Sequence, residues 1–103
     1  MNNYSEHTKY KMRMQTTFKK QLKKISKQGK DLNKLKYVLL KLANGEQLEE
    51  KYHNYRLNND RYYRDCYECH IEPNWLLIYT YLETELVLVL VNTGSHSEVL
   101  SNY

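Results

Sequence analysis

The sequence has no long hydrophobic run and contains little proline, glycine or cysteine. No stretch of about 18 consecutive apolar residues occurs, which excludes a membrane-spanning helix. Residues 1–6 lack the apolar segment of a secretory signal peptide, so we expect a cytoplasmic protein with no membrane partner. With one proline and three glycines among 103 residues, the chain shows no linker, internal repeat or second domain. We therefore expect one domain with a core large enough to fold alone.

The two cysteines lie in Cys66–His70, which spells the C-x-x-C-H pattern of c-type haem attachment. Haem attachment of that kind needs an exported chain, and the sequence shows no export feature. A strand would direct Cys66 and Cys69 to opposite faces, so the two sulfurs could not jointly bind haem or zinc. No second C-x-x-C or histidine pair completes a zinc site. We expect reduced thiols, with Cys69 filling the core, and no metal site.

Positive charge is concentrated in the first half of the chain. Residues 1–45 carry twelve Lys or Arg and two acids, a net charge of +10, whereas residues 46–103 carry four Lys or Arg and ten acids, a net charge of −6. This asymmetry favours a polyanionic partner for the basic half. Seven of the eleven tyrosines fall between Tyr52 and Tyr81, where rings mixed with arginines suit single-stranded RNA. Both patterns also fit ordinary structure, namely a solvated lysine face and tyrosines packed in strands.

Apolar periodicity predicts a strand followed by two helices. Residues Thr8–Gln15 alternate as a half-buried strand would. Phe18, Leu22 and Ile25 then follow helical spacing, with Thr16 or Thr17 as the expected N-cap and Gly29 as the stop. Asp31 is the expected cap of a second amphipathic helix that ends at Asn44-Gly45. Both helices should cover a sheet and show lysines to solvent.

The second half of the chain predicts three strands. We read Glu46–Asp60 as a loop, Tyr62–Glu72 as a strand and Pro73-Asn74 as a turn. Trp75–Leu82 and Leu86–Val91 are two further strands, and the second is apolar on both faces, so it should be central. The order β-α-α-β-β-β indicates an α+β fold.

Two histidines lie close to predicted strand ends, His70 before the turn and His96 after the last apolar run. A sheet can hold such side chains at fixed positions, and imidazoles exchange protons near neutral pH. They therefore form a candidate acid–base pair. Two surface or capping histidines are the simpler alternative.

Several motifs occur in a fixed order along the chain, and together they point to a particular protein family. The block Glu68–Tyr79 reads E-C-H-I-E-P-N-W-L-L-I-Y, and Thr93–Ser97 reads T-G-S-H-S downstream of it. Phe18–Lys24, Gly29–Leu35 and Lys51–Asn54 precede them in that order. The chain resembles the YafQ branch of the RelE-like bacterial toxins, the toxin half of type II toxin–antitoxin pairs. The resemblance implies a toxin domain over residues 10–103 and a flexible N-terminal extension over residues 1–9.

The resemblance also implies a fold, an activity and partners. The family fold is a small twisted, mostly antiparallel sheet packed by two N-terminal helices. The family activity is cleavage of mRNA in the ribosomal A site, by acid–base transesterification without metal or cofactor. A cognate antitoxin would silence the toxin, and the complex would bind operator DNA. The expected nucleic-acid partners of the toxin itself are mRNA and ribosomal RNA.

Carried over by position, His70 and His96 match two catalytic histidines of the family. His96 is the expected general acid and His70 the base or a phosphate contact, although sequence leaves open which takes which role. Asn74 stands where many members have a catalytic Asp, and Tyr55 where a functional His is common. His53 could replace that histidine only if its loop re-aims. The expected substrate contacts are Arg56, Arg64, His53, Trp75, Lys19, Lys20, Lys23 and Lys24.

Other positions depart from the family pattern. Tyr67 and Asn92 stand where related toxins often carry Arg, and Leu100 where a Phe is usual. Arg64 and Arg56 are the expected replacements. These changes predict an attenuated enzyme. The alternative is a catalytically weakened toxin fold that acts mainly through antitoxin binding and operon autoregulation, and a general RNA-binding module is a third possibility.

Overall fold

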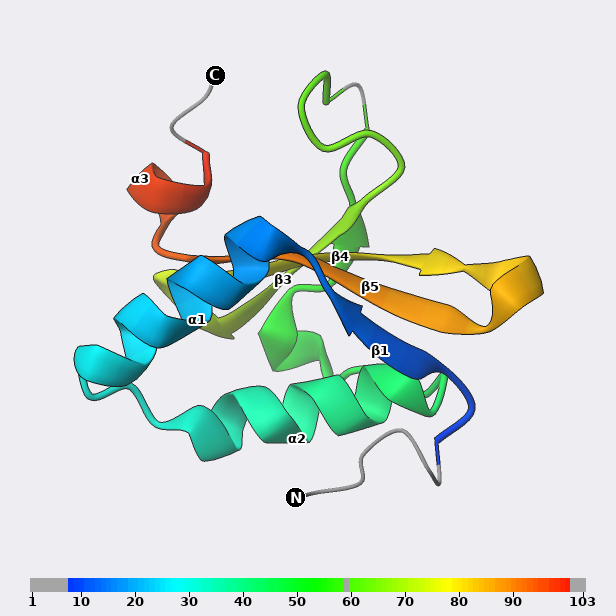
Figure 1. Cartoon of the computed structure of the whole chain (residues 1–103), viewed down its shortest axis with the longest axis horizontal. Coiled ribbons are helices and arrows are strands. Elements are labelled where there is room, and N and C mark those ends of the chain that lie inside the picture. Colours follow the sequence, from blue (N-terminus) through cyan, green and yellow to red (C-terminus); the bar gives the residue numbers. More distant parts are fainter. Residues whose placement is uncertain (1–7, 59, 101–103) are drawn as a thin grey trace.

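The computed structural model describes residues 8–58 and 60–100. Five strands form one sheet in the order β1-β5-β4-β3-β2, and only β1 and β5 are paired in parallel (Figure 1). The strands are β1 (Lys11–Met14), β2 (Tyr55–Arg56), β3 (Tyr67–Glu72), β4 (Trp75–Leu82) and β5 (Val87–Gly94). The predicted α+β class and mostly antiparallel sheet are confirmed, and β5 is an interior strand as expected.

Two helices of twelve residues, α1 (Thr16–Lys27) and α2 (Leu32–Ala43), cover one face of the sheet. Asp31 caps α2 as predicted, because its carboxylate accepts a hydrogen bond from the backbone N–H of Asn33 at 3.0 Å. The predicted threonine cap of α1 is wrong. Gln15 is still extended and donates its N–H to the Leu90 carbonyl at 2.9 Å, so it takes the N-cap position without a side-chain bond. Thr16 is therefore already helical.

Alternate side chains of β4 pack into two separate hydrophobic cores, one on each face of the sheet. Trp75, Leu77 and Tyr79 join the main core under α1 and α2, whereas Leu76 and Ile78 join a smaller cluster on the other face. A loop that precedes β3 and the short helix α3 (His96–Val99) cover that second face (Figure 1). Cys69 lies in the first core and Cys66 in the second, as the strand argument predicted.

The region between α2 and β3 differs most from the prediction. The segment Glu46–Asp60, read as a loop, contains a 3₁₀ turn, η2 (Glu50–Tyr52), and the short strand β2. The strand predicted over Tyr62–Glu72 begins only at Tyr67. The Asp60 carboxylate accepts hydrogen bonds from the backbone N–H groups of Tyr62 and Tyr63, which closes a turn there. Turn chemistry thus overrides the tyrosine-rich strand pattern.

The remaining boundaries shift by a few residues. The strand expected over Thr8–Gln15 covers Lys11–Met14, and the last strand begins at Val87 after the turn η3 (Glu83–Glu85). Residues 1–7 of the expected extension 1–9 lie outside the described residues. Across the described ranges, no helix is long and apolar enough to cross a membrane.

Candidate functional site

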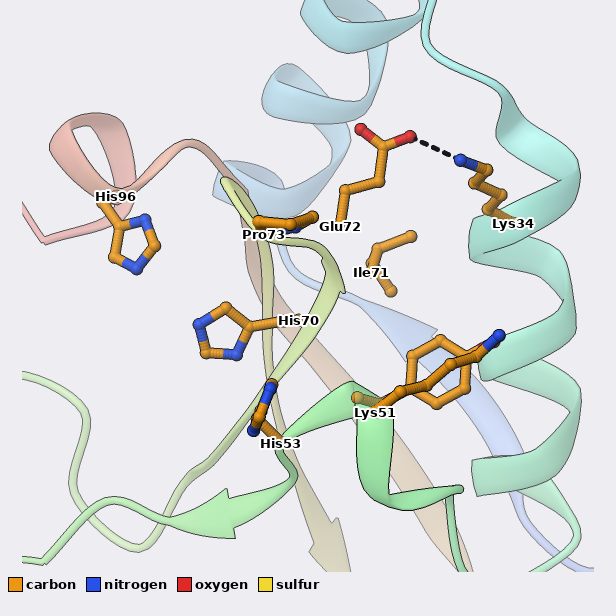
Figure 2. A pocket seen from close by; sticks show the side chains of 9 residues that line it. Lys34, Lys51, His53, His70, Ile71, Glu72, Pro73 and His96 are labelled. Carbon is orange, nitrogen blue, oxygen red and sulfur yellow. Dashed lines mark hydrogen bonds and ion pairs between the residues drawn. The ribbon is translucent and has the colours of Figure 1, made fainter.

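Three histidines from three elements meet at the end of β3. His70 lies on β3, His53 follows η2, and His96 is the first residue of α3. The ring centroids of His53 and His70 are 5.6 Å apart, and those of His70 and His96 are 5.5 Å apart (Figure 2). All three line a hollow of about 690 Å³. Its remaining lining residues are Lys34, Lys51, Tyr52, Ile71, Glu72 and Pro73.

The strand pairing explains why the hollow opens at this place. The short strand β2 pairs only with Tyr67 and Glu68, so it ends before His70. The register of β3 against β4 then shifts between His70 and Glu72, next to the β3–β4 turn. A bulge at a sheet edge re-aims side chains and leaves room beside the strand. No neighbouring strand therefore covers the His70 end of β3 on the β2 side, and a ligand can approach there.

Asn74 in the β3–β4 turn holds His96 at two points. Its side-chain oxygen lies 2.8 Å from Nδ1 of the His96 ring and accepts the backbone N–H of His96 at 3.0 Å. Ser95 caps α3 and forms a reciprocal capping box with Glu98, which fixes the first turn of this helix. The amide oxygen makes Nδ1 the donor, so Nε2 is the nitrogen that a substrate can reach.

His70 lies beside a buried carboxylate. Glu68 is 4% exposed, and its Oε2 lies 3.6 Å from Nε2 of His70. The Tyr55 hydroxyl donates to the same oxygen at 3.2 Å. Burial and the Glu68 charge raise the pKa of Tyr55 above its ordinary value, so this phenol is no base at neutral pH. Nδ1 of His70 is buried and has no hydrogen-bond partner among the described residues.

His53 has an unusual backbone. It ends η2 in the left-handed region, with φ of 45°, and its N–H donates to the Glu50 carbonyl at 3.0 Å. The next residue, Asn54, accepts a hydrogen bond from the Tyr79 hydroxyl at 2.5 Å, which ties the loop to the sheet. The loop places the His53 ring beside His70 at the hollow. Tyr55 is turned toward Glu68 and does not line the hollow.

The far wall of the hollow carries lysines and an acid. Lys30 and Lys34 both pair with Glu72, at 3.3 and 2.9 Å, and Figure 2 shows the pair with Lys34. The hydrogen bond from Lys34 is the main reason why the pKa of Glu72 lies below its ordinary value. Lys51 lies over the Tyr52 ring at 5.3 Å. The sequence did not indicate a role in the site for these residues or for Glu68. The alternation of Glu68 with His70 on one strand was the available signal.

The predicted arginines lie elsewhere. Arg56 and Arg64 line a second hollow of about 420 Å³ that shares no residue with the histidine hollow. Arg56 pairs with Asp65 at 2.9 Å. Arg64 was expected on the His70 face of a strand, but the turn before β3 removes it from that face. Asn92 is buried and donates to the Tyr63 hydroxyl at 2.9 Å, so this family arginine position is structural here.

Trp75 also differs from the expectation. Its side chain is fully buried and its Nε1–H donates to Thr93 Oγ1 at 3.0 Å. The ring therefore offers no exposed surface to a substrate in this structure. The α1 lysines are exposed as expected, and Lys24 pairs with Glu98 of α3 at 2.6 Å. Lys19, Lys20 and Lys23 leave α1 on its solvent side.

Neither cysteine is suited to nucleophilic chemistry. Both are buried and free of disulfide bonds, and burial raises the pKa of each thiol. In the part of the chain that the structure describes, no three His, Cys, Asp or Glu side chains are arranged to hold a metal ion.

Comparison with known proteins gives one consistent family. The family model described as "Bacterial toxin of type II toxin-antitoxin system, YafQ" matches residues 10–101. Two curated relatives, the mRNA interferase toxins YafQ of Escherichia coli strains B / BL21-DE3 and K12, are 38% and 37% identical over 82 residues. These alignments cover 78% of this chain and 84% of each relative.

Solved structures agree with the sequence matches. The crystal structure of a metal-bound toxin from Helicobacter pylori has a TM-score of 0.81 and 37% identity, and covers 87% of this chain and 98% of that one. The E. coli DinJ-YafQ toxin-antitoxin complex gives a TM-score of 0.77 and 29% identity over 88% and 97%. The residues described here include no group of three His, Cys, Asp or Glu side chains that would fit the metal of the first relative. The chain belongs to the YafQ family of bacterial type II toxin–antitoxin toxins.

Proposed function

We propose that this chain is an endoribonuclease toxin that cleaves mRNA in the ribosomal A site and is neutralised by a cognate antitoxin. The observation that carries the proposal is the convergence of His70 and His96, 5.5 Å apart, in an open hollow at the sheet edge. The relatives named mRNA interferase toxins, and the DinJ-YafQ complex among the similar structures, support both the reaction and the partner.

The proposed reaction is metal-independent transesterification. The 2′-oxygen of one nucleotide bonds to the adjacent phosphorus, and the bond from phosphorus to the 5′-oxygen breaks. One proton leaves the 2′-hydroxyl and one reaches the departing 5′-oxygen, so the products are a 2′,3′-cyclic phosphate and a 5′-hydroxyl. Catalysis needs a base, an acid and positive charge near the phosphorane.

Two of these roles follow from the hydrogen bonds. His96 is the acid, because Asn74 holds its Nδ1 and leaves Nε2 to protonate the 5′-oxygen. We assign His70 to the charge developing on the phosphorane, because it lines the hollow beside His96 and its Nε2 lies 3.6 Å from the Glu68 carboxylate. Asn74 is a positioning residue in this scheme, since its amide cannot exchange protons as the usual aspartate could.

The lysines of α1 support binding to the ribosome. Lys19, Lys20 and Lys23 project from one exposed helix and can neutralise phosphates of ribosomal RNA without reading sequence. Such contacts bring the histidine hollow to a translated message and align it there. A toxin that acts on ribosomes would work in the cytoplasm. Operator DNA would be bound only by the complex with antitoxin.

A reconstituted translation reaction tests the proposal. We expect purified toxin to cut a reporter mRNA on programmed ribosomes, to leave free mRNA intact, and to keep its rate when a chelator selective for transition metals is added. His96→Ala should remove the cuts and retain antitoxin binding. A wild-type chain that binds antitoxin and cuts nothing would instead support the binding-protein alternative, which the amide at Asn74 and the buried Asn92 favour.

A further inference from the structure

We infer that Lys24 and Glu98 are positioning residues for His96, through an ion pair that joins helix α1 to the short helix α3. The inference rests on the proposed function, because it concerns the residue to which that proposal gives the acid step. It also gives Lys24 a role other than the RNA contact that the sequence suggested. The pair acts through His96 and touches no substrate itself.

The helix that carries His96 needs support from outside. It is four residues long and begins at His96. A single helical turn is unstable alone, since its few hydrogen bonds do not offset the ordering of the backbone. Asn74 binds His96 at the start of α3, and the Tyr63 hydroxyl donates to the Val99 carbonyl at its end, at 2.6 Å. Neither of these two contacts involves α1, so neither fixes how α3 lies against that helix.

Glu98 supplies the attachment to α1 and uses both carboxylate oxygens. Its Oε1 accepts the backbone N–H of Ser95 at 2.9 Å, and its Oε2 lies 2.6 Å from Nζ of Lys24 on α1 (Figure 1). The Glu98 side chain is only 25% exposed, so water screens this ion pair less than it screens an open surface pair. The hydrogen bond from Lys24 is the main reason why the pKa of Glu98 lies below its ordinary value. One carboxylate thus connects α1 to the residue that precedes His96.

The chain that leads into α3 also passes close to α1. Gln21 on α1 donates to the Thr93 carbonyl at 3.2 Å. A Cβ atom on Gly94 would lie 2.8 Å from both the Gln21 side-chain nitrogen and Oε1 of Glu98. The backbone of Gly94, with φ of +145°, is also one that other residues rarely adopt. A side chain at position 94 would therefore displace the groups that join α1 to α3, which gives the glycine of the T-G-S-H-S motif a physical reason.

A phosphate contact, like those proposed for the neighbouring lysines of α1, is the alternative role for Lys24, and the two roles predict opposite effects of one variant. Glu98→Gln removes a negative charge and releases Lys24, so a phosphate contact would become stronger and cleavage would not slow. Glutamine at this position can still complete the capping box. A positioning role predicts that cleavage slows even though the ribosome is bound at least as tightly, because the His96 ring is less firmly oriented.

Single-turnover cleavage on programmed ribosomes, measured over a range of toxin concentrations, tests the assignment. We expect Glu98→Gln and Lys24→Gln each to lower the rate at saturating toxin by ~10–10²-fold. For Glu98→Gln the half-saturating concentration should stay equal to that of wild type or fall. The double variant should be no slower than the slower single variant, because both changes remove the same ion pair.

Two further variants separate position from charge. Lys24→Arg should keep most of the wild-type rate, since arginine can still pair with the Glu98 carboxylate. Lys27→Gln removes the same charge from the last turn of α1 and is the matched control. Its rate at saturating toxin should equal that of wild type. Hydrogen exchange at the backbone N–H of His96, which Asn74 binds, should be faster in Glu98→Gln than in wild type.

The outcomes separate this inference from the function on which it rests. If Glu98→Gln folds, binds antitoxin and cleaves at the wild-type saturated rate, while His96→Ala is inactive, then the positioning role is overturned and the proposed nuclease stands. Additive losses in the double variant, or an equal loss in Lys27→Gln, would also overturn it. A wild-type chain that cleaves nothing would contradict both the function and this assignment.

Discussion

The side-chain oxygen of Asn74 binds His96 twice, through the ring Nδ1 at 2.8 Å and the backbone N–H at 3.0 Å. The two residues are 22 positions apart in the sequence, and this contact joins the β3–β4 turn to the first turn of α3. The Asn74 amide therefore orients the His96 ring as a carboxylate at this position would. It cannot supply the negative charge that would further stabilise a protonated histidine.

Removal of this contact should slow the reaction without unfolding the protein. We expect Asn74→Ala to reduce single-turnover cleavage by about 10²-fold, because the His96 ring loses its fixed orientation. Asn74→Asp keeps the acceptor and adds charge, so its rate should equal or exceed that of wild type. The check is the rate on programmed ribosomes, and equal rates for Asn74→Ala and wild type would disprove the positioning role.

Glu72 should make stability depend on pH. Lys34 and Lys30 hold the pKa of Glu72 below its ordinary value, so the ionised carboxylate stabilises the folded state at neutral pH. This contribution is present above the unfolded pKa and is lost as pH falls through the lower folded pKa. We expect Glu72→Gln to cost about 0.5–1 kcal/mol at neutral pH, since these pairs are partly solvated.

Glu72→Gln should approach wild-type stability in acid. Once the pH is below the lowered pKa of Glu72, the glutamic acid of the wild type and the glutamine of the variant are both neutral. Urea unfolding at about pH 7 and about pH 3 measures the difference. Lys20→Gln on the exposed side of α1 removes a lysine far from Glu72 in the sequence and serves as the comparison. A Glu72→Gln deficit of the same size at both pH values would show that the loss is one of packing rather than charge.

Trp75 should affect stability rather than RNA recognition. Its ring is fully buried between the sheet and the helices, so Trp75→Ala should reduce the free energy of unfolding by ~3–5 kcal/mol. Trp75→Phe retains most of the volume and should leave ribosome binding as in wild type. Binding and chemical denaturation of the Phe variant provide the check. Weaker RNA binding by a stably folded Trp75→Phe protein would show that Trp75 contributes to RNA binding.

The exposed lysines of α1 should control affinity and its salt dependence. Replacement of Lys19, Lys20 and Lys23 by Gln should weaken ribosome binding uniformly. It should also reduce the slope of log K against log salt by ~0.7–0.9 for each phosphate that is no longer neutralised. Lys24 stays in place because its bond to Glu98 supports α3. An unchanged slope would mean that α1 does not face RNA.

Most of the fold could be predicted because its periodicity is strong. The two helices, β4 and β5 each have an apolar pattern that local turn residues do not contradict. The segment before β3 could not be predicted in this way. Its tyrosines favour a strand, but the Asp60 side chain binds two backbone N–H groups and Asp65 takes a left-handed backbone. Such competition between turn and strand is not visible in a hydropathy pattern.

The same limit applies to the site. His70, His96 and Asn74 could be placed because a rigid strand, a turn and a cap position them. The placement of the His53 ring depends on the left-handed backbone of His53 itself, which sequence spacing does not reveal. Arg64 was assigned to the wrong surface because its position depended on the strand that the Asp60 turn removes. Loop geometry thus decided which basic side chains reach the hollow.

The most direct test of the account is to express this chain alone in a bacterial host and map new mRNA 5′ ends, beside a His96→Ala control. We expect growth arrest with in-frame cuts inside translated messages, and neither effect in the control. Cuts that persist unchanged in His96→Ala would remove this residue from the site. A soluble, antitoxin-binding wild type that produces no cuts would contradict the nuclease itself.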